Sequence, residues 1–158
     1  MDNHQITFEH FDLNNQTHTE AFFNLLKHYM QDPMGDSQAL DEKKQAELIS
    51  LFSQQSNAAS LFLKINNEFV GLVNYFYLIS TFKAKPYIYI HDVIVHNKFR
   101  GKGLGRELIE EIIAIAKEKD CCKIMLEVRD DNAPALSLYN SLGFIDSEPK
   151  NYSWTKLI

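Results

Sequence analysis

The sequence predicts an α+β protein of three layers, with a mixed, mostly antiparallel sheet of six to seven strands between helices. Three observations support this class. Segments that alternate apolar and polar residues recur along the chain, and segments with apolar residues at helical spacing lie among them. Two strand-like segments are joined directly by Asn66-Asn67, which is typical of a hairpin. The 158 residues, 45% of them hydrophobic, are enough for one core, so we expect a single domain over residues 1–158.

The first half of the chain is expected to begin with a strand followed by two helices. Residues 6–11 alternate and predict the strand, and Thr17 or Thr19 can cap a helix that runs to about residue 30. A second helix is expected over roughly residues 37–54. The hairpin follows, with its arms at 61–65 and 69–78.

The second half is expected to alternate between strands and helices. After a loop at 83–86, residues 87–95 predict a long strand, and residues 104–119 form the clearest amphipathic helix. Residues 123–128 predict another strand. A short helix should start near Asn132, with Pro134 in its first turn, and end at Gly143. One or two closing strands in 144–158 would complete the sheet.

Composition and charge exclude several classes of function. The net charge of −5 argues against nucleic-acid binding. No segment approaches the ~18 apolar residues of a membrane span, and the first residues lack a signal-peptide pattern. Cys121 and Cys122 are adjacent and do not easily form a disulfide, so we expect a reduced, cytoplasmic protein. The histidines and cysteines lack the spacing of a metal site, so no metal is expected.

Residues 93–106 read as a strand, a basic turn with three glycines and the start of a helix. The glycines let the backbone approach a ligand closely, and N–H groups at a helix start bind anions. Four basic side chains add positive charge to the turn: Lys98, Arg100, Lys102 and Arg106. A dinucleotide fingerprint would need glycine at position 106, and a Walker loop would need Ser or Thr at position 103. The segment therefore predicts an anion site that is neither of these nucleotide motifs.

Two motifs resemble those of the GNAT superfamily of N-acetyltransferases. Arg100-x-x-Gly103-x-Gly105 is similar to its acyl-CoA signature, and the run Asn132-x-x-Ala135-x-x-Leu138-Tyr139-x-x-x-Gly143-Phe144 resembles its second signature. Ile90-His91-Asp92 is similar to the polyamine (diamine) acetyltransferase branch, which typically carries two acids where this chain has His91 and Asp92. The resemblance implies the GNAT acyl-CoA acyltransferase fold and direct transfer of an acetyl group from acetyl-CoA to a primary amine of a small molecule, polyamine-like or amino-sugar-like.

The resemblance also implies the positions that bind acetyl-CoA. Main-chain groups of Val93 and Val95 would pair with the pantetheine arm as an added strand would, and residues 101–106 would hold the pyrophosphate. The N–H of Ile94 is the expected donor to the developing oxyanion. The complete expected set is Val93, Ile94, Val95, Arg100, Gly101, Lys102, Gly103, Leu104, Gly105, Arg106, Asn132, Ala135 and Tyr139.

Acetyl transfer also needs a proton donor for the thiolate and a proton acceptor for the amine. Tyr139 is the expected acid, because a phenol with a pKa of ~10 is protonated at neutral pH. His91 and Asp92 are both candidate bases, and on a strand they point to opposite faces unless a bulge intervenes. His91 titrates near neutral pH. Asp92 is expected to be half-buried, with Ile90 and Ile94 beside it on one face.

Other readings stay open at this point. Glu127 is a weaker third candidate for the base. The chain can also be a protein or peptide N-acetyltransferase, or a regulator that binds acyl-CoA without catalysis. Residues 1–60 carry nine acids and three bases, so a cationic acceptor and a polyanionic co-substrate are expected to be steered to different ends. A strand containing Tyr152-Ser153-Trp154 would allow pairing into a homodimer.

Overall fold

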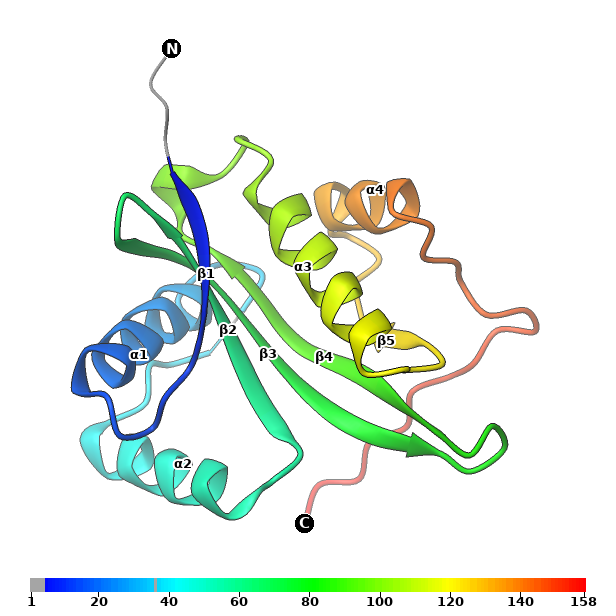
Figure 1. Ribbon diagram of the computed structural model, residues 1–158, viewed down its shortest axis with the longest axis horizontal. Helices are drawn as coiled ribbons and strands as arrows, with labels where there is room; N and C mark the ends of the chain where they lie inside the picture. The colour runs from blue at the N-terminus through cyan, green and yellow to red at the C-terminus, as the bar shows by residue number, and fades with distance from the viewer. Residues whose placement is uncertain (1–4, 36) are drawn as a thin grey trace. The chain divides into compact units, whose positions relative to one another are not determined.

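The computed structural model describes residues 5–35 and 37–158 (Figure 1). The chain forms two compact units, Met1–Glu127 and Val128–Ile158. The first unit contains β1 (Ile6–His10), α1 (Gln16–Met30), α2 (Glu42–Gln54), β2 (Ala58–Ile65), β3 (Glu68–Ser80), β4 (Lys85–Val95), the 3₁₀ turn η1 (Asn97–Phe99), α3 (Leu104–Glu118) and β5 (Ile124–Leu126). The second unit contains α4 (Ala133–Ser141). Across the described residues, no helix combines the length and the apolarity needed to span a membrane.

The sheet of the first unit has the strand order β1-β2-β3-β4-β5. Strands β1 to β4 pair antiparallel, and β5 pairs parallel with β4. Asn66 and Asn67 form the turn between β2 and β3, with φ of 49° and 70°. Asparagine tolerates this left-handed conformation, which a two-residue hairpin turn of this type requires. The predicted α+β class, with a mixed and mostly antiparallel sheet, is confirmed.

Helices cover both faces of this sheet. Leu72 of β3 belongs to an apolar cluster with Phe22 of α1, and Phe52 of α2 packs against that cluster. The preceding residue, Gly71, faces the other way, because a Cβ added there would lie 3.0 Å from the side chain of Leu108 in α3. Neighbouring residues of a strand point to opposite faces. In the first unit, α1 and α2 therefore cover one face and α3 covers the other (Figure 1).

The number of strands is lower than predicted. The described residues form a sheet of five strands rather than six to seven. Residues 144–158 contain neither helix nor strand, so the predicted closing strands are wrong. Polar residues and Pro149 interrupt this stretch, and proline cannot donate to a strand ladder. The strand that was expected to pair two copies is therefore absent from this stretch.

Two helices begin at positions other than those predicted. Asn15, not Thr17 or Thr19, caps α1, because its Oδ1 accepts from the N–H groups of Thr17 at 3.0 Å and His18 at 3.4 Å. The second helix begins at Glu42 rather than at residue 37, because Asp41 provides its cap. Both caps are short polar side chains that satisfy N–H groups at a helix start.

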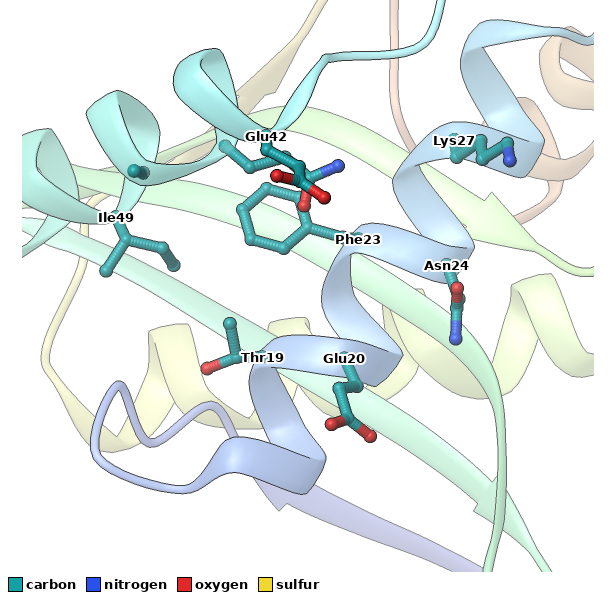
Figure 2. Close-up of a pocket in the computed structure, with 9 residues that line it drawn as sticks. Thr19, Glu20, Phe23, Asn24, Lys27, Glu42 and Ile49 are labelled. Carbon is teal, nitrogen blue, oxygen red and sulfur yellow. The ribbon is translucent and has the colours of Figure 1, made fainter.

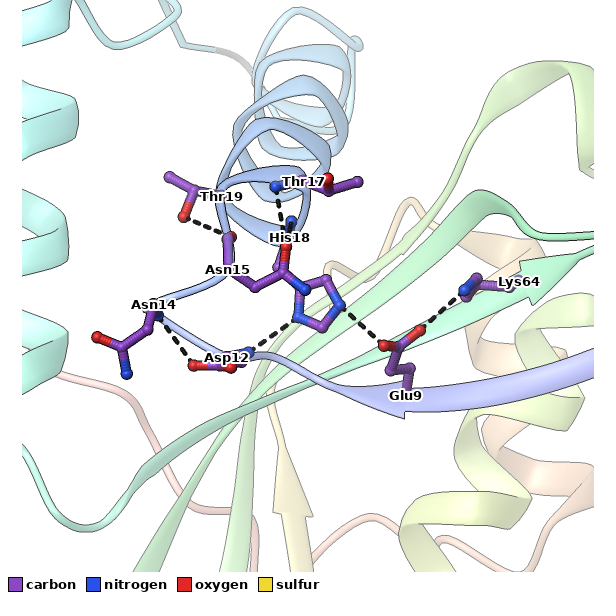
Figure 3. A network of polar contacts seen from close by, with 8 residues as sticks. All are labelled: Glu9, Asp12, Asn14, Asn15, Thr17, His18, Thr19 and Lys64. Carbon is purple, nitrogen blue, oxygen red and sulfur yellow. Dashed lines mark hydrogen bonds and ion pairs between the residues drawn. The ribbon is translucent and has the colours of Figure 1, made fainter.

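A polar network joins β1, α1 and β2 (Figure 3). His18 is 4% exposed, and its Nδ1 accepts from the N–H of Asp12 at 3.0 Å. Its Nε2 therefore carries the proton and donates to Glu9 Oε1 at 2.9 Å. Glu9 Oε2 lies 2.8 Å from Lys64 Nζ, and this contact is the main reason that the pKa of Glu9 is lowered. These contacts attach the start of α1 to the edge of the sheet.

Candidate active site

Strand β4 carries a bulge in its middle. Asn74 of β3 pairs with Asp92, but the next residue, Tyr75, pairs with Ile90, so His91 is an extra residue in the ladder. A bulge re-aims the side chains of the strand that carries it. Here it brings two candidate bases together, because His91 Nδ1 lies 3.0 Å from Asp92 Oδ2. The sequence did not decide whether a bulge occurs between these two residues and their neighbours, and the structure contains one.

The bulge also changes which residues share a face with Asp92. Asp92 and Ile94 lie on the same face, as expected, since they are two positions apart after the bulge. Ile90 pairs with Tyr75, which follows Asn74 on β3 and therefore faces the other side of the sheet. The prediction that Ile90 and Ile94 both flank Asp92 on one face is wrong for Ile90. In a strand without a bulge, Ile90 and Ile94 would both share a face with Asp92.

The two side chains of this pair differ in exposure. The imidazole of His91 is 62% exposed, whereas the carboxylate of Asp92 is 16% exposed. The hydrogen bond that His91 donates to Asp92 raises the pKa of His91 above 6.5, burial opposes this, and the charges of Asp92 and Glu127 add to it. With Nδ1 donating to the carboxylate, the neutral ring carries its lone pair on Nε2. The pair therefore offers an accessible proton acceptor that is backed by a partly buried carboxylate.

Aromatic and acidic groups surround the pair. The ring of Phe76 lies 6.3 Å from the ring of His91 in an edge-on arrangement. Burial, followed by the charges of Glu127 and Asp92, raises the pKa of Tyr89. Glu127, the third candidate base, thus acts on both His91 and Tyr89 through its charge.

The main-chain groups of Val93 and Val95 face away from β3. The N–H of His96 donates to the carbonyl of Val70 on β3 at 2.9 Å. Alternate residues of an antiparallel strand direct both main-chain groups to the same neighbour, so Ile94 also faces β3. The N–H of Ile94, expected to donate to the oxyanion, thus lies on the β3 side, and the N–H of Val93 faces the opposite edge.

That edge of β4 is open after the bulge. Strand β5 pairs with β4 only through residues 88–90. In residues 5–35 and 37–158, no strand pairs with positions 93–95 on the side away from β3. The carbonyl of Val95 accepts from Arg100 Nε at 3.0 Å. Apart from this bond to Arg100, the outward main-chain groups of Val93 and Val95 have no partner strand among the described residues.

The turn between β4 and α3 depends on two left-handed glycines. Gly101 and Gly103 have φ of +73° and +81°, which L side chains rarely adopt. Space is not the reason for glycine, because nothing lies within 4 Å of a Cβ built at either position. Gly103 is the N-cap of α3 and offers no side-chain bond to the first turn. The first N–H groups of α3, including that of the buried Leu104, therefore have no side-chain cap.

Arg100 connects this turn to the end of α1. Its guanidinium donates to Asp32 Oδ2 at 2.8 Å and to the carbonyl of Val95 at 3.0 Å. A second link comes from His28 of α1, whose Nε2 accepts from the N–H of Asn97 at 3.1 Å. Arg100 thus shapes the turn, and no local pattern in the sequence pointed to its partner Asp32 or to the contact between His28 and Asn97.

The other bases of the turn lie near the surface. Lys102 Nζ lies 5.4 Å from the centre of the Phe99 ring. Arg106 pairs with Glu110 one helical turn further on, at 3.3 Å. Lys98 is exposed. Positive charge therefore surrounds the uncapped start of α3.

Helix α4 of the second unit forms as predicted. Asn132 caps it, and its Oδ1 accepts from the N–H of Ala135 at 3.3 Å. Gly143, with φ of +85°, follows the end of the helix. The ring of Tyr139 lies 5.7 Å from that of Phe144, and the N–H of Phe144 donates to the carbonyl of Tyr139 at 3.0 Å. These contacts hold Tyr139 on the last turns of α4.

A separate pocket of about 720 Å³ lies between α1 and α2 (Figure 2). Phe23 and Ile49 line it together with the acidic Glu20 and Glu42. None of the residues predicted to bind acetyl-CoA or to transfer protons lines this pocket. It is therefore distinct from the site on β4.

The sheet, the bulged β4 with its open edge and the glycine turn before α3 together define the acetyltransferase class of α+β folds. Residues 19–144 match the model of the Acetyltransferase (GNAT) family. The chain belongs to this family.

Known proteins of several kinds are similar to the chain. A thialysine N-epsilon-acetyltransferase of Bos taurus is 36% identical over 77 residues, which are 49% of this chain and 45% of the relative. The N-alpha-acetyltransferase RimI of Mycobacterium tuberculosis is 35% identical over 86 residues, which are 50% of this chain and 52% of the relative. The structure of an aminoglycoside N-acetyltransferase, AAC(6')-Iy, in complex with CoA has a TM-score of 0.72 at 16% identity, over 98% of this chain and 97% of that one. The chain spans about half the length of the curated relatives it matches.

Proposed function

We propose that this chain is an N-acetyltransferase that transfers the acetyl group of acetyl-CoA directly to a primary amine of a small molecule. The observation that carries the proposal is the His91–Asp92 pair, with 3.0 Å between Nδ1 and Oδ2, at the bulge of β4. Membership of the GNAT family supports it. The open edge of β4 and the basic glycine turn follow the pair directly along the chain.

The chain offers the groups that an acyl-CoA needs. A pyrophosphate suits the uncapped N–H groups at the start of α3 and the positive charge of Lys98, Lys102 and Arg106. The amides of a pantetheine arm suit the outward main-chain groups of Val93 and Val95, as in the addition of a strand to a sheet edge. Arg100 supports this site indirectly, because its guanidinium is bonded to Asp32 and Val95. We assign to Asn132 and Ala135 a role in binding the same co-substrate.

Proton transfer is assigned to three side chains. A primary amine with a pKa of ~10.4 is mostly ammonium at neutral pH and must lose a proton before it attacks. His91 Nε2 takes this proton, and the carboxylate of Asp92 stabilises the imidazolium that results. Acetyl-CoA supplies the acetyl group as a thioester. The N–H of Val93 donates to the carbonyl oxygen as negative charge develops, and the hydroxyl of Tyr139 gives a proton to the leaving sulfur.

We propose a diamine-type or polyamine-type acceptor. Ile90-His91-Asp92 resembles the polyamine acetyltransferase branch, and the matched thialysine N-epsilon-acetyltransferase is named for an amine of this kind. Nine acids against three bases in residues 1–60 favour a cationic acceptor. The match to an N-alpha-acetyltransferase supports a second candidate, the free N-terminus of a peptide.

The test is release of free CoA from acetyl-CoA by the purified chain. The acceptors are a panel of polyamines, thialysine and lysine analogues, amino sugars and peptides with free N-termini. We expect turnover with a diamine-type acceptor, and a large loss of kcat in Tyr139→Phe with unchanged CoA binding. His10→Ala, an exposed histidine of β1, is the matched control for His91→Ala.

Three results would redirect the proposal. Turnover only with peptides would make the chain a peptide N-acetyltransferase. CoA binding in calorimetry without turnover on any acceptor would make it an acyl-CoA-binding regulator. Full activity of His91→Ala would contradict the assignment of the base.

The setting of the protein is also part of the proposal. Cys121 and Cys122 are both free thiols, which suits a reducing cytoplasmic compartment. Light scattering would test the homodimer that the sequence suggested.

A further inference from the structure

A row of polar side chains crosses the middle of the sheet and ends at the His91–Asp92 pair. Ser60 of β2, Asn74 of β3 and Asp92 of β4 lie directly opposite one another in the strand register. Ser60 Oγ lies 2.7 Å from Asn74 Oδ1, and Asn74 Nδ2 lies 2.9 Å from Asp92 Oδ2. Ser60 is 2% exposed and Asn74 is 5% exposed. The row therefore connects the exposed imidazole to the interior of the sheet.

The next row on the same face is apolar. Phe62, Leu72 and Ile94 occupy it and pack in the cluster beneath α1. A buried hydroxyl and a buried amide oppose folding unless each finds a partner, and apolar side chains at both positions would avoid that cost. The fold alone therefore gives no reason for Ser60 and Asn74. The contact of Asn74 with Asp92, which Ser60 supports through Asn74, does give one.

The hydrogen bonds of this row can run in only one direction. The carboxylate of Asp92 accepts and cannot donate, so Asn74 must turn its NH₂ group toward it. The carbonyl of Asn74 then faces Ser60, whose hydroxyl donates. The same Oδ2 of Asp92 also accepts from the Nδ1–H of His91. Two donors on one oxygen fix the carboxylate, and the carboxylate in turn keeps the proton of the neutral imidazole on Nδ1.

We propose that Ser60 and Asn74 are positioning residues, which act through Asp92 to hold His91 in the tautomer whose Nε2 is free to accept the proton of the amine. The catalytic part of this inference rests on the proposed function. Its structural part concerns the state of one imidazole ring and does not need turnover.

The experiment is long-range ¹H–¹⁵N NMR of the histidine rings across a pH titration of the full chain. In the natural protein we expect mainly the Nδ1–H form of His91, because Asp92 accepts from Nδ1. A free neutral imidazole in water would instead distribute its proton between both nitrogens. The double variant Ser60→Ala/Asn74→Leu removes both buried polar groups together and leaves neither without a partner. We expect its His91 to gain Nε2–H tautomer and its pKa to move toward 6.5. Asp92 and Glu127 are the charged groups that raise this pKa, and the double variant substitutes neither of them.

Two further variants separate positioning from stability. Ser60→Thr keeps the hydroxyl and should keep the natural tautomer, whereas Ser60→Ala should shift it part of the way. Leu72→Val perturbs the apolar row on the same face, so it should lower the melting temperature without changing the tautomer.

Kinetics gives the second readout. In the double variant we expect kcat to fall on the order of tenfold to a hundredfold, as for a misplaced catalytic group. The KM for acetyl-CoA should not change. An unchanged tautomer and pKa of His91 in the double variant would overturn the positioning role, even in an active enzyme. A shifted tautomer in a chain that acetylates no acceptor would support positioning and overturn the proposed function instead.

Discussion

In the proposed reaction, the imidazole of His91 and the carboxylate of Asp92 are assigned different tasks because their surroundings differ. His91 is the more exposed of the two, and its ring can reach a soluble amine. Asp92 is largely buried and bonded to Asn74 and His91, so its charge stays in place. A buried acceptor beside an exposed base resembles the logic by which an aspartate orients a catalytic histidine. At the scale of single residues, the choice of base between these two thus favours His91.

Replacing Asp92 by Asn tests this division of tasks. The hydrogen bond to the carboxylate is the main cause of the raised pKa of His91, so this pKa should fall toward 6.5 in Asp92→Asn. His91 acts as a base only when neutral, so kcat/KM should rise with pH through this pKa. In the variant the rise should shift to lower pH, while the plateau falls on the order of a hundredfold or more. The measurement is the pH profile of kcat/KM.

Glu127→Gln is the control for this experiment. Glu127 acts on His91 through its charge alone, so its removal should shift the profile in the same direction by less. A rise at the same pH in Asp92→Asn and in the natural protein would rule out His91 as the titrating base.

The His91–Asp92 pair also affects the stability of the fold. Because the folded pKa of His91 lies above 6.5, its contribution is complete below pH 6.5 and is lost as the pH rises through the folded pKa.

The turn between β4 and α3 is held in shape by an element far away in the sequence. The guanidinium of Arg100 reaches Val95 and, beyond it, Asp32 just after α1. A planar guanidinium can serve both acceptors at once, and a lysine ammonium is not interchangeable with it. The shape of the turn should therefore depend on the guanidinium and not only on its charge.

Arg100→Lys tests that dependence. The variant keeps the charge and loses the bridging geometry, so the KM for acetyl-CoA should rise roughly threefold to tenfold, about the cost of one hydrogen bond. The measurement is initial-rate kinetics at saturating amine. Lys117→Gln, which removes an exposed charge from the last turn of α3, should leave this KM unchanged. If Arg100→Gln raised the KM and Arg100→Lys did not, charge alone would explain the role of Arg100.

Local signals account for the elements that the sequence predicted well. The Asn66-Asn67 turn, the apolar stripe of α3 and the Asn132 cap of α4 each depend on residues close together in the chain. The closing strands were overpredicted because the sequence of 144–158 cannot reveal whether a neighbouring strand exists. The predicted start of the second helix missed the Asp41 cap.

Signals between distant residues account for what the sequence could not provide. The bulge is defined only relative to β3, because it is a shift in the register of the β3–β4 pairing just after Asn74. The Ser60–Asn74–Asp92 row likewise depends on the register of three strands. The candidate residues His91 and Asp92 could be named from the sequence, but their contact and their buried support could not.

At the scale of the whole molecule, opposite charges are concentrated in different parts of the chain. Residues 1–60 have a net charge of −6, from nine acids and three bases, and four bases lie between positions 98 and 106. Part of the acidity is used within the fold, because Glu9 pairs with Lys64 and Asp32 pairs with Arg100. Less charge therefore remains to attract a cationic acceptor than the sequence suggests.

Ionic strength should therefore affect the two substrates unequally. Salt screens exposed charges over a Debye length of about 10 Å at 0.1 M and about 3 Å at 1 M. We expect the KM for acetyl-CoA to rise several-fold over this range and the KM for the amine to rise less. Initial rates in increasing NaCl provide the measurement, and Lys102→Gln should reduce the salt dependence for acetyl-CoA. Two KM values that do not respond to salt would disprove steering.

The bulge on β4 also separates what this sheet needs for folding from what it needs for chemistry. With position 91 deleted, Asp92 would follow Ile90 directly, and both would keep their present partners, Asn74 and Tyr75, in an unbroken ladder. The shortened strand would still pair with β3 along its length, but it would no longer carry the imidazole. In evolutionary terms, a single inserted codon in this strand is enough to add an imidazole to a structural ladder, and we expect a single deletion to abolish the proposed acetyl transfer without unfolding the protein.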